Sequence, residues 1–413
     1  MVDSLKYVLI IGDGMADNPV EALGGKTPIE YAQTKTIDKL ASAGKVGSVK
    51  TCPEGLVPGS DTAILSIFGC DPLIYSKGRA PLEAAASGIE VKPGNIAYRC
   101  NMVTYSDDDV PLEQKRILSH SAGSIEGDVS IEIIEKLFSH PEFASRAKKA
   151  GISVYPAPSF RHIVIQQKAD VSGLELSTPH DHLGEQIGTL LPYGCENAKI
   201  LKELMVLAYE ILNHDPINEK RRAEGKMPAN GIWFWAAGSA VELPNFYETY
   251  KKTGGVISAV PLCHGIGILV GLEQVAVEGA TGELQTNYEG KVEAGFGVLK
   301  NNDFTAIHIE SPDECTHEGD LKGKLQAIEW LDTRVVAPMI EKLQAAGYDY
   351  RMLIVSDHKT LMATRGHDGT PVPYLIYDSR IDQKTGAVYS EAQGEKGTYL
   401  PKGVLLMDEL FER

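Results

Sequence analysis

Three short apolar runs along the chain have the length and composition of buried strands. They cover residues 6–11 (KYVLII), 304–309 (FTAIHI) and 352–355 (MLIV). Largely apolar runs of this length are typical of parallel strands that are covered on both faces. Shorter runs at residues 46–49 and 373–377 predict two further strands.

Helical periodicity separates these runs. Residues 29–43 have an apolar face and are followed by Gly44, residues 321–346 are amphipathic, and Ser60 opens an apolar, helix-like run. Strands and helices that alternate in this way predict an α/β protein whose mostly parallel sheet is flanked by helices. Residues 384–398 are polar and predict a surface excursion.

The pattern changes between about residues 107 and 227, where the predicted strands and helices are shorter and polar loops intervene. A strand at residues 232–235 then leads back towards the core. We therefore predict an inserted α+β domain at residues 95–249. The remaining residues, 1–94 and 250–413, form a discontinuous core domain in this interpretation.

Charge and cysteine usage narrow the class of protein. The formal net charge of −16 argues against a nucleic-acid partner, which would require a basic patch. It does not exclude an anionic substrate, because a metal and a few basic residues can dominate a local field. The six cysteines form no CxxC pair, which is typical of reduced thiols in a cytoplasmic protein.

Membrane association is not predicted. The first residues, MVDSLK, include an acid and lack the long apolar region of a signal peptide. The uncharged stretch at residues 254–272 is nearly long enough to span a bilayer. Because it contains five glycines and Pro261, we predict a buried strand, a turn and a helix instead.

Residues with metal-ligand chemistry follow the predicted strands. Asp13 follows the first strand, and Asp357 and His358 follow the run at residues 352–355. Open α/β sheets bind ligands at the carboxyl ends of their strands, and Asp with His suits Zn-, Mn- or Mg-like ions. An N-cap Asp beside a hydrogen-bonded His is the structural alternative.

A second group of such residues lies nearby in the sequence. The strand at residues 304–309 leads to Asp313 and His317, which are four residues apart and so share one side of a helical turn. His367 follows His358 by nine residues. A solvated acidic loop is the alternative for the segment around Asp313.

Ser60 follows Pro58 and Gly59 at the predicted start of a helix. A serine there can cap the helix, or it can be a nucleophile whose phosphoester is held by the N–H groups of the first turn. The second role needs a metal to activate the hydroxyl. Two Asp/His groups beside a serine suit two metals about 4 Å apart that clamp a phosphoryl group.

Several motifs run nearly from end to end of the chain: IIGDGMAD, VPGSDTA, KGRAPLEA, PHD at 179–181, MPAN, ATGELQTNY, PDECTHEGD and SDH. In these motifs the sequence resembles the 2,3-bisphosphoglycerate-independent phosphoglycerate mutases of the archaeal-type branch, within the alkaline phosphatase superfamily. The resemblance implies an alkaline-phosphatase-like metal core with a cap domain. It also implies interconversion of 3- and 2-phosphoglycerate without 2,3-bisphosphoglycerate.

The resemblance further implies roles for individual residues. Ser60 becomes the transiently phosphorylated nucleophile. One metal is held by Asp13, Ser60, Asp357 and His358, and the other by Asp313, His317 and His367. The choice among Mn, Mg, Zn and Co stays open, because geometry and availability decide it. The oligomeric state also stays open, with a homo-oligomer among the possibilities.

The sequence indicates the phosphoryl-transfer chemistry more strongly than it indicates which molecule accepts the phosphoryl group. Basic candidates for binding a small phosphorylated metabolite are Arg79, Arg161 and Lys291. Archaeal-type members tend to carry an arginine after the strand that resembles residues 232–235, where this chain reads WAAG. Arginine forks are the usual clamps for carboxylate and phosphate.

Three alternatives follow from these observations. The first is a phosphotransferase of the same chemistry that acts on another acceptor, such as homoserine. The second is a metal-binding module without turnover. The third, an NAD-dependent dehydrogenase, is disfavoured because a GxGxxG fingerprint starting at Gly12 would need glycine where Asp17 stands.

Overall fold

The computed structural model describes residues 5–413, so the acid at position 3 lies outside the described residues. The chain forms two compact units: one comprises the segment up to Ser76 together with Glu242–Arg413, and the other comprises Lys77–Val241. The second unit is inserted between the two segments of the first, as the sequence leads one to expect.

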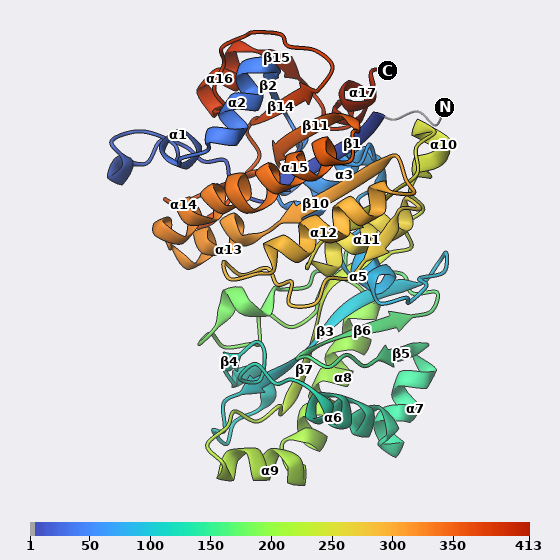
Figure 1. The fold of residues 1–413 in the computed structure, drawn as a ribbon. Helices are drawn as coiled ribbons and strands as arrows, with labels where there is room; N and C mark the ends of the chain where they lie inside the picture. The colour runs from blue at the N-terminus through green and yellow to red at the C-terminus, as the bar shows by residue number, and fades with distance from the viewer. Residues whose placement is uncertain (1–4) are drawn as a thin grey trace. The chain divides into compact units, whose positions relative to one another are not determined.

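An eight-stranded sheet forms the centre of the first unit, with the order β15-β2-β14-β11-β1-β10-β8-β9. β1 lies between β10 and β11 and runs parallel to both, and the antiparallel pairs of this sheet are those made by β14 (Figure 1). The predicted mostly parallel sheet is confirmed. The strands are β1 (Leu5–Gly12), β2 (Lys45–Val49), β8 (Gly254–Ile257), β9 (Glu273–Val275), β10 (Phe304–Ile309), β11 (Asp349–Ser356), β14 (Val372–Asp378) and β15 (Thr398–Leu400).

Helices cover this sheet, because its central strands are buried along nearly their whole length and would otherwise expose apolar side chains. α12 packs on β10 and α15 packs on β11 (Figure 1). The helices of the unit are α1 (Pro28–Tyr31), α2 (Lys35–Ala43), α3 (Ser60–Ile67), α4 (Pro72–Tyr75), α10 (Phe246–Tyr250), α11 (Pro261–Leu269), α12 (Tyr288–Leu299), α13 (Ser311–Glu318), α14 (Leu321–Trp330), α15 (Ala337–Ala345), α16 (Glu391–Lys396) and α17 (Leu405–Phe411). A two-stranded hairpin of β12 (Lys359–Leu361) and β13 (Gly366–Asp368) follows β11.

The second unit is an α+β domain with an antiparallel five-stranded sheet. Its long central strand β3 pairs with β4, β6 and β7, and β5 pairs with β6. The strands are β3 (Ile96–Tyr105), β4 (Ile117–Ser119), β5 (Ile152–Tyr155), β6 (Arg161–Gln166) and β7 (Gly231–Ser239). The helices are α5 (Ala80–Ala86), α6 (Asp128–Ser139), α7 (Pro141–Lys149), α8 (Glu196–Leu212) and α9 (Pro216–Ala223).

The boundaries of the units differ from the predicted ones at 94/95 and 249/250. α5 belongs to the second unit because Ala80 and Ala84 pack against Ala97, Ile163 and Ile165 of its sheet. At the other boundary, α10 belongs to the first unit, where the ring of Phe246 stacks on that of Phe304 with 5.0 Å between centroids.

Two local predictions are corrected. Residues 29–43 form two helices, because the amides of Thr36 and Ile37 donate to the Asp332 carboxylate and a new helix begins at Lys35. The polar stretch 384–398 is not wholly a surface excursion, since Tyr389 and Glu391 are buried.

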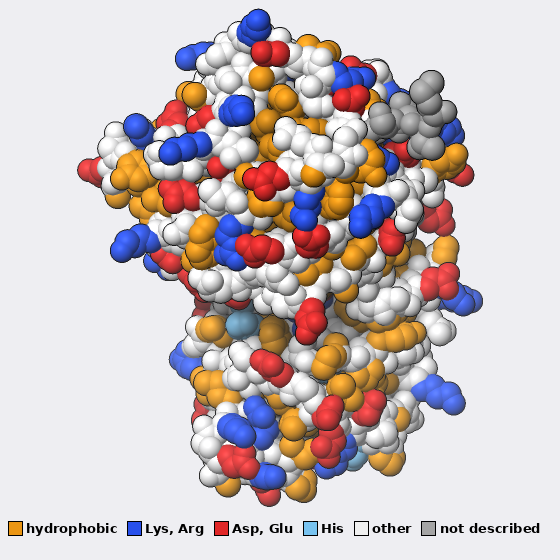
Figure 2. Space-filling view, viewed as in Figure 1, with side chains coloured by type: hydrophobic (Ala, Val, Ile, Leu, Met, Phe, Trp, Pro, Cys, Tyr) orange, Lys and Arg blue, Asp and Glu red, His pale blue; other side chains and the backbone are white. Residues whose placement is uncertain are grey.

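The helices formed by residues 5–413 include none that is both long and apolar enough to cross a bilayer. The stretch at residues 254–272 forms β8 and α11, joined by a turn. On the face shown in Figure 2, basic and acidic side chains are interspersed, so this face carries no field of a single sign.

We expect Arg351→Met to destabilise the first unit. The Arg351 guanidinium is buried in β11, 2.7 Å from the Asp378 carboxylate, and Nε donates to the carbonyl of Leu410. Breaking a buried ion pair costs about 3 kcal/mol, because the remaining charge loses its partner. Arg380 also contacts Asp378 and limits the loss. Urea denaturation followed by circular dichroism measures the change, and an unchanged midpoint would contradict the expectation.

Candidate active site

The register of three parallel strands determines where the site lies. Gly12, the last residue of β1, pairs with Ile309 of β10 on one side and with Ser356 of β11 on the other. Side chains that follow these residues therefore meet at one edge of the sheet. Asp13 follows β1 and Asp357 follows β11, while α13, which begins two residues after β10, carries Asp313 and His317.

Asp13, Asp357 and His358 form a buried group whose ligand atoms lie within 4.8 Å of one another. One oxygen of each carboxylate, Oδ1 of Asp13 and Oδ2 of Asp357, is buried without a hydrogen-bond donor among the described residues. Burial and the neighbouring carboxylates raise the pKa of Asp13 well above its usual value. Unpaired buried oxygens of this kind are costly unless a cation binds them, so the donor set fits a divalent metal.

The backbone fixes the orientation of Asp357. Its Oδ1 accepts hydrogen bonds from the amides of Gly14 and His358, at 3.0 and 2.8 Å. Gly14 has φ +59°, and a Cβ there would lie 2.4 Å from Thr360 Oγ1 and 2.6 Å from Asp313 Oδ1. Only glycine allows the loop after β1 to approach so closely.

Ser60 is the first residue of α3, and Gly59 rather than Ser60 is the N-cap. The capping alternative for Ser60 is therefore not what the structure has. Instead, Ser60 Oγ lies 3.2 Å from His358 Nε2 and 3.4 Å from Asp13 Oδ2. The Ser60 hydroxyl therefore lies beside the ligand atoms of the buried group, at the N-terminus of α3.

A second group joins Asp313, His317 and His367. The Asp313 carboxylate lies 3.1 Å from His317 Nε2 and 3.5 Å from His367 Nε2, and the two Nε2 atoms are 3.0 Å apart. These hydrogen bonds outweigh burial and hold the pKa of Asp313 below its usual value. The α-helix supplies the i, i+4 spacing of Asp313 and His317, as predicted from the sequence.

Backbone carbonyls orient both imidazoles of this group. His317 Nδ1 lies 2.8 Å from the carbonyl oxygen of Arg365, and His367 Nδ1 lies 3.3 Å from that of Pro58. A carbonyl can only accept, so each Nδ1 carries a proton and each Nε2 faces the shared point. The hydrogen bond with Asp313 raises the pKa of His317 to about 9, and a metal ion held by this group would take the place of the Nε2 proton.

The two groups are continuous rather than separate. His358 lies within 4.8 Å of ligand atoms of Asp13 and Asp357, and also of Asp313 and His367. Its ring centroid is 4.2 Å from that of His367. The structure thus brings together all seven residues with predicted metal-ligand chemistry.

Two residues that were not predicted from the sequence form hydrogen bonds with candidate ligands of this site. His308, buried in β10, lies with Nε2 2.9 Å from Asp13 Oδ2 and with Nδ1 3.0 Å from Ser258 Oγ. Thr360 donates its hydroxyl to Asp313 Oδ1 at 2.6 Å. A lone histidine in the apolar run at residues 304–309 was the available signal for His308; the sequence offers none for Thr360.

The basic residues predicted to bind substrate lie in different places. Lys291 is fully buried in α12, and its Nζ donates to the carbonyl of His308 at 3.1 Å. It therefore supports the strand that carries His308 instead of lining an open surface. Burial lowers its pKa to about 8.

Arg79 and Arg161 belong to the second unit. Arg161 lies over the ring of Trp235, 5.2 Å from its centroid, and Nε donates to Asn101 Oδ1. Burial, together with the charge of Arg79, lowers the pKa of Arg161 to about 10. Arg79 Nε is buried without a hydrogen-bond acceptor among the described residues. Two cations this close, one with an unpaired donor, form a candidate anion site.

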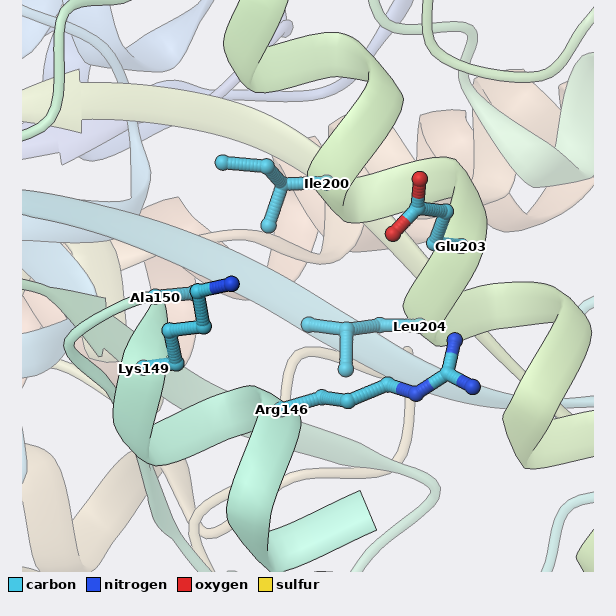
Figure 3. A pocket seen from close by; sticks show the side chains of 6 residues that line it. All are labelled: Arg146, Lys149, Ala150, Ile200, Glu203 and Leu204. Carbon is cyan, nitrogen blue, oxygen red and sulfur yellow. The ribbon is translucent and has the colours of Figure 1, made fainter. Parts of the chain in front are cut away.

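A hollow of about 460 Å³ lies elsewhere in the second unit, between α7 and α8 (Figure 3). Its lining is Arg146, Lys149, Ala150, Ile200, Glu203 and Leu204. Arg146 is already paired with Glu142 at 2.7 Å. None of these lining residues is a nucleophile or part of a metal-ligand group, so size alone does not make this hollow the active site.

Fold and site together define the class: an α/β protein that places a serine at a helix start beside buried Asp and His ligands, as phosphoryl-transfer enzymes with metals do. The model of the family described as "2,3-bisphosphoglycerate-independent phosphoglycerate mutase" matches residues 41–218. The protein of that name from Methanosarcina barkeri is 40% identical over 398 residues, covering 95% of this chain and 96% of its own.

Two further comparisons agree. A Geobacter sulfurreducens protein described as a probable 2,3-bisphosphoglycerate-independent phosphoglycerate mutase is 39% identical, over 99% of this chain and 100% of its own. A solved structure of a Pyrococcus horikoshii protein is 29% identical, with a TM-score of 0.79 over 100% of this chain and 98% of its own. The chain belongs to the 2,3-bisphosphoglycerate-independent phosphoglycerate mutase family.

Asp13→Asn provides a test of the buried carboxylate group. In metal-free protein we expect the variant to be more stable than wild type, because burial and repulsion from the neighbouring carboxylates oppose the ionised form of Asp13. Its amide oxygen can still accept from His308. With Mn²⁺ at about 100 times Kd, wild type should gain about 2.7 kcal/mol, and the variant much less. Thermal denaturation with chelator and with Mn²⁺ measures both; equal stabilisation of the two proteins would contradict the expectation.

Proposed function

We propose that this protein is a metal-dependent phosphoglycerate mutase that interconverts 3- and 2-phosphoglycerate through phosphorylated Ser60, without 2,3-bisphosphoglycerate. The observation that carries the proposal is the placement of Ser60 Oγ, 3.2 Å from His358 Nε2 and 3.4 Å from Asp13 Oδ2. Family membership supports the same activity, since the relatives at about 40% identity carry that name.

Ser60 acts as the nucleophile in this proposal. Its Oγ gives up its proton and attacks phosphorus, the bond from phosphorus to the glycerate oxygen breaks, and that oxygen takes up a proton to leave as a hydroxyl. The other hydroxyl of the same glycerate then gives up its proton and attacks phosphorus, the bond to Ser60 Oγ breaks, and Ser60 Oγ is protonated again. Because Ser60 lies at the N-terminus of α3, the positive end of the helix dipole would stabilise the charge of the phosphoryl oxygens.

The proposed ligands divide between two divalent ions. Asp13, Ser60, Asp357 and His358 hold one ion, and Asp313, His317 and His367 hold the other. When bound, such ions lower the pKa of a coordinated hydroxyl and neutralise phosphoryl charge. Mixed carboxylate and imidazole donors are compatible with Mn, Mg, Zn or Co, and manganese is the ion we propose to test first.

We further propose that Arg79 and Arg161 bind the anionic groups of the substrate. Support comes from the unpaired donor of Arg79 and from the closeness of the two guanidinium groups. Arg99, by contrast, is paired with Glu83. The role of the second unit as a closing cap stays a prediction.

A second candidate is transfer to another acceptor, such as homoserine, by the same core. The observation that favours it is the end of β7, where Trp235 is followed by Ala236, Ala237 and Gly238 instead of an arginine. The strand bulges here, with a register shift opposite β3, and Ala236 has φ +50°. Bulges and strained residues of this kind are common beside functional sites.

We also propose a cytoplasmic location, which the free state of all six cysteines supports. The expectations that nucleic acid and membranes are not partners stay predictions, as does association into a homo-oligomer.

The decisive experiment is a coupled assay of 3-phosphoglycerate conversion by Mn²⁺-loaded wild type, Ser60→Ala and Ser66→Ala. Ser66 is a buried serine of the same helix and serves as the matched control. We expect Ser60→Ala to lose at least about 10³-fold in kcat/KM, since no other group can form the intermediate, and Ser66→Ala to keep its activity.

Three outcomes would overturn the proposal. Full activity of Ser60→Ala would exclude the phosphoserine. Folded, metal-loaded wild type that fails on phosphoglycerate but phosphorylates homoserine with ATP would establish the second candidate. Metal binding with no turnover on either substrate would leave a metal-binding module.

A separate prediction concerns Arg79. We expect Arg79→Met to raise KM for phosphoglycerate by about 10- to 100-fold with a smaller change in kcat, because a charge-assisted hydrogen bond to substrate is lost. Arg146→Met removes an arginine of the same unit that is already paired with Glu142, and it should leave KM unchanged. Steady-state kinetics of the two variants measure the difference; equal KM values would argue against substrate binding by Arg79.

A further inference from the structure

A buried lysine, Lys324, contacts the hairpin that carries part of the candidate metal site. In this hairpin Thr360 of β12 pairs with His367 of β13, and His358 directly precedes β12. Lys324 comes from α14, and its side chain is 0% exposed. Its Nζ donates to the carbonyl of Thr360 at 2.6 Å and to Asp17 Oδ2 at 2.9 Å.

Asp17 connects this lysine to other segments of the chain. Its Oδ2 also accepts from the amide of Met362, at 3.1 Å, where the hairpin begins to turn. Its own amide donates to Glu391 Oε1 on α16, at 3.1 Å. The Lys324–Asp17 pair therefore joins the loop after β1, α14, α16 and two points of the hairpin.

Thr360 connects the hairpin to two of the candidate ligands, Asp313 and His358. Its hydroxyl donates its single proton to Asp313 Oδ1, and its oxygen lies 3.2 Å from His358 Nδ1. The oxygen must then accept a hydrogen bond from the protonated Nδ1 of His358, which leaves Nε2 of His358 unprotonated and directed towards Ser60 and Asp13. The position of Thr360 thus decides both the orientation of Asp313 and the tautomer of His358.

Stability alone does not account for the Lys324–Asp17 pair. Removing an ammonium from water costs free energy, and apolar residues of similar volume often stabilise a fold as well or better than a buried ion pair does. The pair does, however, hold at two points a hairpin whose neighbours include three candidate ligands: Lys324 Nζ donates to the carbonyl of Thr360, and Asp17 Oδ2 accepts from the amide of Met362. Such directed contacts are what outer partners of metal ligands supply.

We propose that the buried Lys324–Asp17 pair is a positioning device that holds the β12–β13 hairpin in register with α13, and so sets the affinity for the ion at Asp313, His317 and His367. This inference rests on the proposed function, in which that ion is one of two. Lys324 and Asp17 touch neither the ion nor the substrate; they act through Thr360 and the hairpin backbone.

The test is a Mn²⁺ titration that resolves two dissociation constants, with His317→Ala used to assign the constant that belongs to the hairpin ion. We expect Lys324→Met to raise the dissociation constant of the hairpin ion by about 10- to 100-fold, the usual effect of removing an outer partner of a metal ligand. The dissociation constant of the other ion should change by less than about threefold. Asp17→Asn is the second variant, because it keeps the volume and an acceptor for the amide of Met362 and removes only the charge.

Arg351→Met is the matched control, since it removes a buried ion pair at the opposite end of β11. We expect it to lower the melting temperature without changing either constant. Co²⁺ absorption spectra give an independent readout, in which Lys324→Met and Asp17→Asn should alter the bands of one bound ion only.

The outcomes separate this inference from the proposed function. Unchanged constants in both Lys324→Met and Asp17→Asn would overturn the inference alone, as would a loss at both ions that Arg351→Met reproduces. Wild type that binds no divalent ion would overturn the proposed function together with the inference.

Discussion

Three carboxylates buried at one edge of a parallel sheet are the constraint on which the rest of this structure depends. Burial raises the pKa of Asp13, and its repulsion from the neighbouring Asp357 and Asp313 carboxylates raises it further. The protein partly offsets this repulsion with imidazoles, through His308 at Asp13 and His317 at Asp313. The two carboxylate oxygens that remain without donors are the strongest sign in the structure that cations complete the site.

The parallel register and the hairpin determine how this edge is built. β1, β10 and β11 end level with one another, so residues far apart in the sequence become neighbours. The hairpin after β11 then brings His367 back to Asp313, and Gly14 makes room where Thr360 and Asp313 approach the loop after β1. Asp13, Asp357, His358 and His367 thus lie on or next to strands whose positions are determined by backbone pairing, which suits a site that must be rigid.

The two units divide the chemical work in the proposed function. The first unit supplies the nucleophile and the ligands, which relatives with the same chemistry would share. The second supplies the arginines and the bulged end of β7 around Trp235, where this chain differs from the expected pattern. In the proposed function, the inserted unit therefore selects the acceptor, whereas the core carries out phosphoryl transfer.

The sequence by itself determined the mostly parallel sheet, and it singled out the seven residues that the structure brings together, because apolar runs, turn residues and strand ends are local features. It did not determine the unit boundary at Ser76, since only packing shows that Ala80 and Ala84 contact the second sheet. Nor did it reveal that Asp332 caps the helix beginning at Lys35, or that Lys324 pairs with Asp17. Those contacts join residues about 300 positions apart, and their partners are chosen by the tertiary fold, which local sequence does not encode.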